Sequence, residues 1–275
     1  MDLDMYKHPS TTSSCEKLQS YGNVMIPATL GELASGLHGE GRMVEPEDLL
    51  DFLMEYLSKG LPLSGKKVLI TAGPTYEAID PVRFIGNHAT GLMGYELAKT
   101  AANLGAEVVL VSGPTHLPIS HSLIDLQKVV SAEEMYEKVH SHYQNMDIVI
   151  SAAAVADYRP KFVSQQKIKK KEGDFSIDLV KTRDILFSMG EQKKNQYLVG
   201  FALETENELE NAKAKLKKKN LDAIVLNSLN DDGAGFAKTT NKITFIDKNS
   251  TIKSFELKSK TAVAEDIFAE ILKRY

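Results

Sequence analysis

The chain has 275 residues, of which 43% are hydrophobic and 25% are charged, and this composition is typical of a soluble globular protein with one large domain or two small ones. The net charge of −4 argues against nucleic-acid binding, and the single cysteine, Cys15, excludes an intramolecular disulfide and suits a reducing compartment. No apolar run reaches membrane-spanning length and no secretory leader opens the chain, so we expect a cytoplasmic protein without a membrane partner.

Residues 1–60 show little regular alternation of apolar and polar positions. They allow one short helix and one short strand, Asn23 to Ile26, and the glycine-rich residues 31–44 indicate a loop. A helix is expected over 45–57, because Pro46 stands in its first turn beside acidic residues. This is too little alternation for a sheet, and we interpret the segment as the truncated tail of a domain, partly ordered at best.

Regular alternation begins after Gly65. The elements expected in the first half are strand 67–71, helix 91–104, strand 107–112, a short strand at 129–130, helix 132–144 and strand 147–151. Those expected in the second half are strand 174–180, helix 183–190, strand 197–202, helix 206–219, strand 222–227, a hairpin of 242–247 with 251–257, and helix 259–273. The pattern predicts an α/β fold: a Rossmann-like, doubly wound, mostly parallel sheet with a C-terminal β-hairpin and closing helix. Ligands of such sheets bind beyond the carboxyl ends of the strands.

Strand 67–71 leads into two loops that suit a ligand. The turn at Gly73 has small residues that let another molecule approach the backbone, and the helix start at Thr90-Gly91 offers free N–H groups to an anion. The sequence Gly-Pro-Thr recurs at 113–115, which predicts two neighbouring strand ends that face one crevice. The first turn has neither Walker spacing nor G-x-G-x-x-G, so a structural turn explains it as well as a binding loop does.

Asn87 and Asp157 are the polar residues that best suit chemistry near these loops. An amide just before a helix start can hold a carbonyl or oxyanion during acyl transfer, although helix capping is the simpler explanation for Asn87 alone. A carboxylate after a strand end can accept hydrogen bonds from a base or a ribose, and the alternative for Asp157 is a solvated loop acid.

Lysines gather in two segments of the second half. One is KIKKK, residues 167–171, and the other is a helix in which Lys215 and Lys219 stand one turn apart on a shared face. Charge runs are usually solvated surface, which is the default interpretation of both segments. Two lysine sets near strand-end loops nevertheless suit a triphosphate better than a neutral ligand.

Several common chemistries lack their residues. The seven histidines are scattered, with no H-E-x-x-H and no Cys/His metal set, and no G-x-S-x-G elbow is present. A nicotinamide-dependent reductase on the same sheet is the alternative enzyme class. The missing G-x-G-x-x-G argues against it, and so does the spacing of Tyr158 and Lys161, which is too short for a tyrosine–lysine dyad.

Six motifs follow one another in a recognisable order over about 66–275: ITAGPTYEAIDPVRFIGNHATGLMG, VSGPT, SAAAVADYRPK, KIKKK, VGFALET and KKKNLDAIVLN. In these motifs the chain resembles phosphopantothenoylcysteine synthetase, the ligase of coenzyme A biosynthesis, in its bacterial form. The resemblance implies a CTP-dependent reaction. The carboxylate of 4′-phosphopantothenate attacks CTP, giving an acyl-cytidylate and pyrophosphate, and the amine of cysteine then displaces CMP to form the amide.

The resemblance also carries roles to particular residues. Asn87 matches the asparagine that handles the acyl-cytidylate, and Lys167 matches a mobile nucleotide-contacting lysine whose charge offsets the negative charge growing on phosphate. The other nucleotide contacts that it implies are Gly73, Ser151, Ala152, Ala153, Asp157, Arg183, Asp184, Ile185, Leu186, Phe201, Lys215 and Lys219. Its phosphopantothenate contacts are Asn87, Ala89, Thr90 and Gly91. It further implies Mg²⁺ held largely by phosphate oxygens, no identified protein ligand to that metal, and a homodimer whose partner subunit completes the phosphopantothenate site.

The chain departs from the family pattern at four positions. Ala89, Thr90 and Leu92 stand where the family often has two serines and a basic residue, and Arg183 replaces a proline and adds a candidate phosphate contact. Ala89, Leu92 and the truncated N-terminal segment motivate a non-enzyme alternative, a nucleotide-binding relic that binds CTP without releasing pyrophosphate.

Residues 1–60 resemble the closing part of phosphopantothenoylcysteine decarboxylase, the flavoprotein usually fused ahead of the synthetase. MDLDMYKHP parallels its Pro-x-Met-Asn-x-x-Met-Trp region and GELASGLHGEGRMVEP its substrate flap, but Asp2 and Ser35 replace the asparagine and the cysteine acid. The half that holds the flavin phosphate and the catalytic histidine has no counterpart in this sequence. We therefore expect neither FMN nor decarboxylase activity on this chain.

Overall fold

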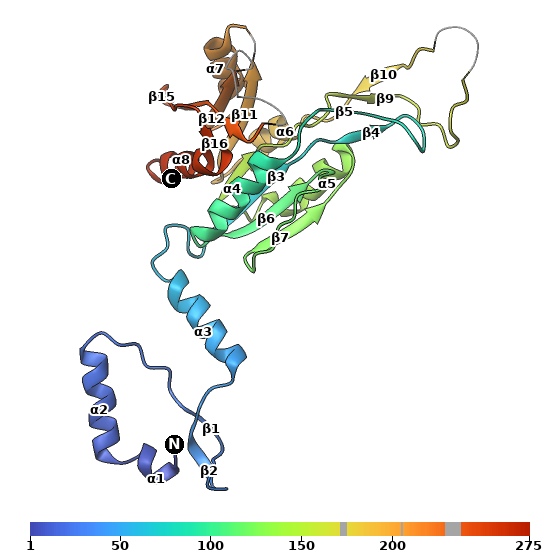
Figure 1. The fold of residues 1–275 in the computed structure, drawn as a ribbon. Helices are drawn as coiled ribbons and strands as arrows, with labels where there is room; N and C mark the ends of the chain where they lie inside the picture. The colour runs from blue at the N-terminus through green and yellow to red at the C-terminus, as the bar shows by residue number, and fades with distance from the viewer. Residues whose placement is uncertain (171–174, 205, 229–237) are drawn as a thin grey trace. The chain divides into compact units, whose positions relative to one another are not determined.

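The computed structural model describes residues 1–170, 175–204, 206–228 and 238–275, and the chain divides into two compact units, Met1–Gly60 and Leu61–Tyr275 (Figure 1). Three predicted motif or strand positions, Lys171, Asp174 and Thr205, lie outside the described residues.

The first unit consists of short helices and a two-stranded antiparallel ribbon. Its elements are α1 (Leu3–Tyr6), α2 (Pro9–Ser20), β1 (Thr29–Glu32), β2 (His38–Arg42) and α3 (Pro46–Ser58). The helix expected over 45–57 is confirmed as α3, but the strand expected at 23–26 is wrong, because that segment has no regular structure. The glycine-rich segment is not simply a loop either: it contains the ribbon, whose turn pairs Leu33 N–H with the Leu37 carbonyl at 2.8 Å. Its glycine positions carry no side-chain alternation that would reveal a strand.

The second unit is built on an eight-stranded sheet in the order β15-β14-β12-β11-β8-β3-β6-β7. The strands are β3 (Lys67–Ala72), β6 (Glu107–Ser112), β7 (Ile124–Lys128), β8 (Ile148–Ser151), β11 (Tyr197–Glu204), β12 (Ala223–Ser228), β14 (Ile243–Asp247) and β15 (Ile252–Ser254). The six from β7 to β12 in this order are parallel, and β14 and β15 add the expected antiparallel hairpin. The predicted doubly wound, mostly parallel sheet is confirmed.

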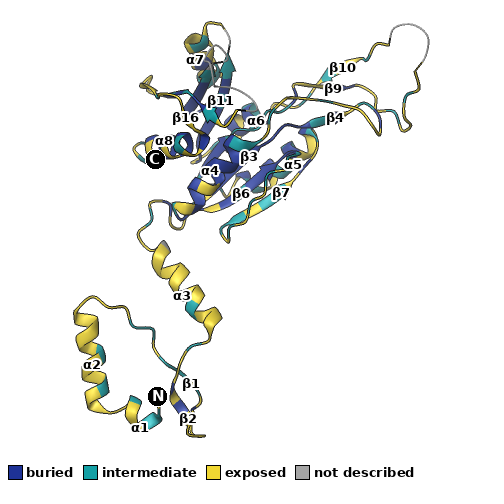
Figure 2. Cartoon of the chain, viewed as in Figure 1, coloured by how far each residue is buried: buried dark blue, intermediate teal, exposed yellow. Residues whose placement is uncertain are grey.

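Helices cover both faces of this sheet. The helices are α4 (Leu92–Asn103), α5 (Ala132–Tyr143), α6 (Ile185–Gln192), α7 (Glu208–Lys218) and α8 (Lys260–Leu272). Helices α4 and α8 pack on one apolar layer, and α5, α6 and α7 pack on the other. Figure 2 shows that the buried residues concentrate in the central strands and in α4. Within the described parts of the chain, no helix has the length and apolar character that crossing a membrane requires.

Two antiparallel strand pairs lie outside the sheet. They are β4 (Tyr76–Ala78) with β5 (Phe84–Gly86), and β9 (Tyr158–Pro160) with β10 (Leu179–Lys181), and of these four strands only β10 overlaps a strand expected from the sequence. The two pairs run side by side away from the sheet, and Ser164 N–H donates to the Ile79 carbonyl at 3.0 Å between them (Figure 1). We call them together the arm. A third small pair joins β13 (Thr240–Asn241) to β16 (Lys258–Ser259), just before α8.

Two strand predictions in this unit were misplaced. The strand expected at 129–130 is instead β7 at Ile124–Lys128, an edge strand in which half-buried Ile124 and Leu126 alternate with polar residues. The alternation signals a half-buried strand better than the two adjacent valines do. Of the strand expected at 174–180, only the end is observed, as β10.

The order of the strands fixes where a ligand binds. The chain passes from β3 through α4 to β6 on one side, and β8 then pairs with β3 on the other side. The strand order therefore reverses between β3 and β8, and the crevice at their carboxyl ends is the expected ligand position in such sheets.

Candidate active site

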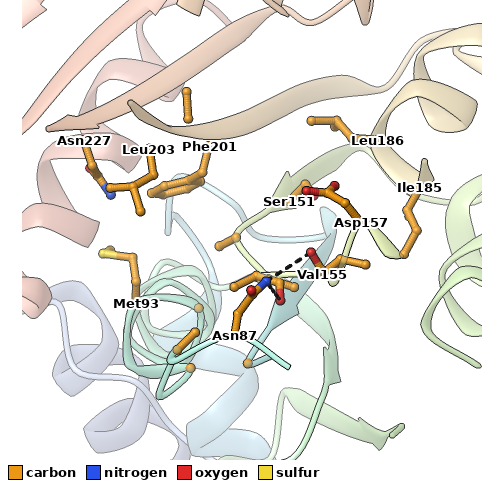
Figure 3. Close-up of a pocket in the computed structure, with 18 of the residues that line it drawn as sticks. Asn87, Met93, Ser151, Val155, Asp157, Ile185, Leu186, Phe201, Leu203 and Asn227 are labelled. Atoms are coloured by element: carbon orange, nitrogen blue, oxygen red, sulfur yellow. Dashed lines mark hydrogen bonds between the residues drawn. The ribbon is translucent and has the colours of Figure 1, made fainter. Parts of the chain in front are cut away.

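A cavity of about 630 Å³ lies at this switch point, beyond the ends of β3, β8, β11 and β12 (Figure 3). All the predicted site residues except Lys167 line it. They are Gly73, Asn87, Ala89, Thr90, Gly91, Ser151, Ala152, Ala153, Asp157, Arg183, Asp184, Ile185, Leu186, Phe201, Lys215 and Lys219. Predicted residues as far as 146 positions apart in the sequence, Gly73 and Lys219, thus share one cavity.

The turn after β3 is held tightly against its neighbours. Gly73 has a φ of 77°, and a Cβ at this position would lie 3.1 Å from the Gly113 carbonyl oxygen, so glycine is needed there. The Ala154 N–H donates to the Gly73 carbonyl at 2.9 Å, which ties the end of β3 to the segment after β8. The repeated Gly-Pro-Thr does mark neighbouring strands, β3 and β6, but only the Gly73 turn lines the cavity.

The alanine run after β8 is fixed by two threonines of the β3 segment. Ala153 N–H donates to Thr71 Oγ1 at 3.2 Å, and Ala156 N–H donates to Thr75 Oγ1 at 3.0 Å. Both threonines are buried. The short side chains of the alanines leave the cavity open. The threonine hydroxyls accept hydrogen bonds from backbone N–H groups of this run, which need a partner where water is excluded.

Asn87 lies between the α4 side of the cavity, marked by Met93, and the β8 side, marked by Val155 (Figure 3). Its Nδ2 donates to the Ala154 carbonyl at 3.0 Å and to the Val155 carbonyl at 3.2 Å. Two carbonyl oxygens so close to one amide atom require that atom to be nitrogen, which fixes the orientation of the amide. Asn87 is therefore anchored through its donors to the segment that follows β8, with its Oδ1 left as an acceptor.

The first turn of α4 presents bare backbone donors to the cavity. Gly91 caps the helix with a φ of 84° and supplies no side-chain hydrogen bond. Met93 and Gly94 line the cavity, and their N–H groups find no acceptor in the described parts of the chain. Together with the helix dipole, such groups favour an anion.

The opposite wall carries lysines that already have protein partners. Lys215 Nζ donates to the Phe201 carbonyl at 2.8 Å, and Lys219 Nζ lies 2.8 Å from an Asp184 carboxylate oxygen. Burial and the neighbouring charge of Lys219 lower the pKa of Lys215. Burial alone would raise the pKa of Asp184, but hydrogen bonds from Lys219 and from Phe187 N–H outweigh it and lower that pKa.

Arg183 lines the cavity, but its guanidinium is engaged elsewhere. It pairs with the Glu133 carboxylate and stacks on the Tyr136 ring, 3.6 Å from the ring centroid. To reach a phosphate, this side chain would have to leave two partners on α5.

Lys167 is exposed and does not line the cavity. The next residue, Ile168, is held by the arm: its N–H donates to Asp80 at 3.1 Å and its carbonyl accepts from Arg83 at 2.6 Å. Asp80 is buried, and the backbone that carries Lys167 is thus anchored next to that lysine.

Five polar residues of the cavity wall were not singled out from the sequence: Lys181, Thr182, Asn227, Asn241 and Lys260. A strand-end position could have pointed to Asn227, which stands near the end of a predicted strand. Nothing in the local sequence marks Lys260, which is one of several lysines before the last helix. Among the described residues, no group of three or more His, Cys, Asp or Glu side chains is placed to hold a metal ion.

The fold and this cavity define an α/β protein of the Rossmann-like class with a candidate ligand site at the switch point of its sheet, and comparison with known proteins names its family. Residues 63–275 match the family model of the DNA/pantothenate metabolism flavoprotein C-terminal domain, so the chain belongs to this family. The resemblance inferred from the six motifs is thereby confirmed.

Two curated relatives and one solved structure illustrate the match. The coenzyme A biosynthesis bifunctional protein CoaBC of Bacillus subtilis is 44% identical over 98% of this chain and 67% of its own length. A protein of an unknown prokaryotic organism, named cysteine/cysteine sulfinic acid decarboxylase, is 52% identical over 99% of this chain and 77% of its own length. The crystal structure of the C-terminal domain of CoaBC is 44% identical, with a TM-score of 0.66 over 78% of this chain and 97% of that domain.

Proposed function

We propose that this chain is a ligase of coenzyme A biosynthesis that joins 4′-phosphopantothenate to cysteine, with CTP as the activating nucleotide and an acyl-cytidylate as the intermediate. One observation carries the proposal: the cavity at the switch point brings Asn87 and the α4 N-terminus together with the nucleotide motifs of β8, α6 and α7. The similarity to the C-terminal domain of CoaBC supports it. The decarboxylase name of one relative refers to a protein longer than this chain, whereas the matched residues 63–275 belong to the C-terminal domain family.

In the first half-reaction, the phosphopantothenate carboxylate attacks the α-phosphorus of CTP and pyrophosphate leaves. Negative charge grows on the transferring phosphate and on the leaving group, and cations at fixed positions stabilise it. Lys215 and Lys219 occupy one wall of the cavity. We assign Lys167 to the same charge, with the segment anchored at Ile168 delivering it to the bound nucleotide.

In the second half-reaction, the amine of cysteine attacks the acyl carbon, CMP leaves with the former carboxylate oxygen, and the amine loses a proton. Asn87 holds the acyl-cytidylate for this attack. Donation to the acyl carbonyl requires Asn87 to release one of its bonds to Ala154 and Val155, and the bond that remains keeps the amide oriented.

Mg²⁺ fits this proposal as a companion of the nucleotide. The acids at the cavity are Asp157 and Asp184, and the second is already paired with Lys219 and caps α6. A metal with so few free carboxylates is held mainly by phosphate oxygens, as Mg²⁺ often is, and it would neutralise charge on the triphosphate.

A homodimer and a cytoplasmic location complete the proposal. The arm exposes several large apolar side chains: Val82, Phe84, Tyr158, Phe162, Val163, Phe175 and Leu179. A cluster of this kind on one projecting feature suits burial against a second subunit. Analytical ultracentrifugation should give a dimer mass that Phe162→Asp shifts toward the monomer, whereas a wild-type monomer at micromolar concentration would contradict it.

The assay for the proposed function follows pyrophosphate release from CTP, with phosphopantothenate present or absent and with cysteine present or absent. Release that requires phosphopantothenate, and amide product that requires cysteine, are the expected results. Tight CTP binding without pyrophosphate release would instead support the nucleotide-binding relic. Parallel reactions with ATP test the nucleotide preference.

A further inference from the structure

Lys260 is a buried cation that faces the cavity and has no side-chain partner among the residues that the structure describes. Lys260 is only 6% exposed and is the first residue of α8. No carboxylate or carbonyl of the described residues accepts a hydrogen bond from its ammonium group, and burial lowers its pKa. An unpaired buried ammonium is costly, so its position at a ligand cavity indicates that the ligand supplies the counter-charge.

The neighbourhood of Lys260 adds further donors for an anion. Thr261 Oγ1 donates to Glu96 Oε2 at 2.8 Å, which ties the first turn of α8 to α4. The unpartnered N–H groups of Met93 and Gly94, at the start of α4, line the same cavity as Lys260. The free N–H groups of the α4 N-terminus and the Lys260 ammonium thus line one cavity, an arrangement that suits a phosphoryl group.

A second unsatisfied group lies on this side. Asn241 is 2% exposed, and its Oδ1 has no hydrogen-bond partner, while its Nδ2 donates to Asn227 Oδ1 at 3.3 Å. Both asparagines line the cavity. The buried Asn241 Oδ1 lacks a hydrogen bond and lies in the same cavity lining as Lys260. We take this to indicate that a bound ligand and its water complete this wall.

The lysines of the opposite wall differ from Lys260 in their hydrogen-bond partners. Lys215 and Lys219 have a carbonyl and a carboxylate as partners, whereas the ammonium of Lys260 has neither within the described part of the chain. The cavity therefore offers two separate places for negative charge, and the proposed reaction brings two phosphorylated substrates to it.

We propose that Lys260, with the Met93 and Gly94 N–H groups, forms a phosphoryl-binding subsite on the α4/α8 side of the cavity. This inference rests on the proposed function for the identity of its ligands, which are the terminal phosphates of CTP or the phosphate of phosphopantothenate. It needs no turnover to be tested, because the subsite binds a phosphoryl group in either case.

The experiment compares wild type with Lys260→Met, Lys260→Arg and the matched control Lys258→Met by isothermal titration calorimetry. Lys258 lies two residues earlier, is exposed and pairs with Asp266. The probes are inorganic pyrophosphate, CTP against CMP, and phosphopantothenate against pantothenate. Thermal unfolding of each variant accompanies the titrations.

Lys260→Met should weaken pyrophosphate binding about 10- to 100-fold, the usual effect of losing a charge-assisted hydrogen bond, while Lys260→Arg retains part of it and Lys258→Met has no effect. A loss for CTP but not CMP assigns the subsite to the nucleotide, and a loss for phosphopantothenate but not pantothenate assigns it to the acid substrate. The unfolding temperature of Lys260→Met should not fall, because the substitution removes an unpaired buried charge.

Unchanged pyrophosphate affinity in Lys260→Met, or no measurable pyrophosphate binding by wild type, would overturn the subsite. Equal losses for the phosphorylated and unphosphorylated probes would also overturn it, since they indicate a structural role. A wild type that binds pyrophosphate through Lys260 but never forms product would refute the proposed function and leave the subsite standing.

Discussion

Replacement of Asp80 by asparagine tests how the arm positions the segment that carries Lys167. One oxygen of Asp80 accepts from the N–H groups of Val82 and Arg83, at 2.8 and 2.9 Å. The other accepts from Arg83 Nε at 3.0 Å and from Ile168 N–H at 3.1 Å. Burial alone would raise the pKa of Asp80, but Arg83 and these N–H groups hold it well below its ordinary value, so the group is ionised at all working pH values.

The size of the effect follows from which bonds asparagine can keep. Its Oδ1 still accepts from the N–H groups of Val82 and Arg83. Its Nδ2 is a donor, so it cannot accept the hydrogen bonds of Arg83 Nε and Ile168 N–H. The Arg83 side chain is 45% exposed and turns to water, so the main loss is the hydrogen bond of the half-buried Ile168 N–H. An N–H that loses its acceptor corresponds to a factor of about 10 to 100 in the equilibrium for local opening.

Native-state hydrogen exchange measures this opening directly. Exchange at the Ile168 amide should accelerate about 10- to 100-fold in Asp80→Asn, while amides of β3 keep their wild-type rates. The control is Asp125→Asn, since Asp125 is exposed and, among the residues with described positions, pairs with one side chain, that of Gln127. Acceleration spread evenly over the sheet, or none at Ile168, would refute the assignment of Asp80 as the local anchor.

Three further predictions concern the two half-reactions and acid stability. Asn87→Asp should slow aminolysis about 10²- to 10³-fold and more than acyl-cytidylate formation, because a carboxylate cannot donate to the acyl carbonyl; equal losses would contradict the role. Lys167→Gln should suppress formation of the acyl-cytidylate itself in a single-turnover assay, and normal accumulation would count against it. Burial alone would raise the pKa of Glu270, but Lys253, Lys273 and Arg274 lower it from 4.5 to about 2. Its stabilisation is therefore complete above pH 4.5 and lost as the pH falls toward 2, so Glu270→Gln should lower the free energy of unfolding by about 2 kcal/mol at neutral pH and by little near pH 2, in urea titrations. A difference that does not change with pH would show that the charge is not responsible.

The fold could be predicted from the sequence where strands are buried on both faces. Val68, Leu69 and Ile70 form a continuous apolar run because β3 has helices on both sides, and α8 shows its packed face in Val263, Ile267 and Ile271. The edge strand β7 and the arm were harder, because half-buried strands and short ribbons are defined by pairing partners rather than by local apolar content. Residues such as Phe84 and Phe162 are exposed in this chain, so hydrophobicity alone gives no guide to their place.

The site residues could be predicted from the sequence where they lie at strand ends and in family motifs. Gly73 and Asp157 both follow buried strands, and strand order then brings them to one cavity. Lys260 could not be predicted in this way. Its burial, and the lack of a partner for its ammonium among the described residues, arise only when α8 packs beside α4. The partners of Arg183 on α5 were hidden for the same reason, because they come from a helix 50 residues earlier.

The central claim is that the carboxylate of phosphopantothenate is activated as an acyl-cytidylate. The most direct measurement uses phosphopantothenate with ¹⁸O in its carboxylate, CTP, Mg²⁺ and cysteine, followed by mass spectrometry of the CMP formed. The carboxylate oxygen that attacks phosphorus leaves with CMP when the amine displaces it, so the account predicts CMP that carries one ¹⁸O. Amide product accompanied by unlabelled CMP would contradict it.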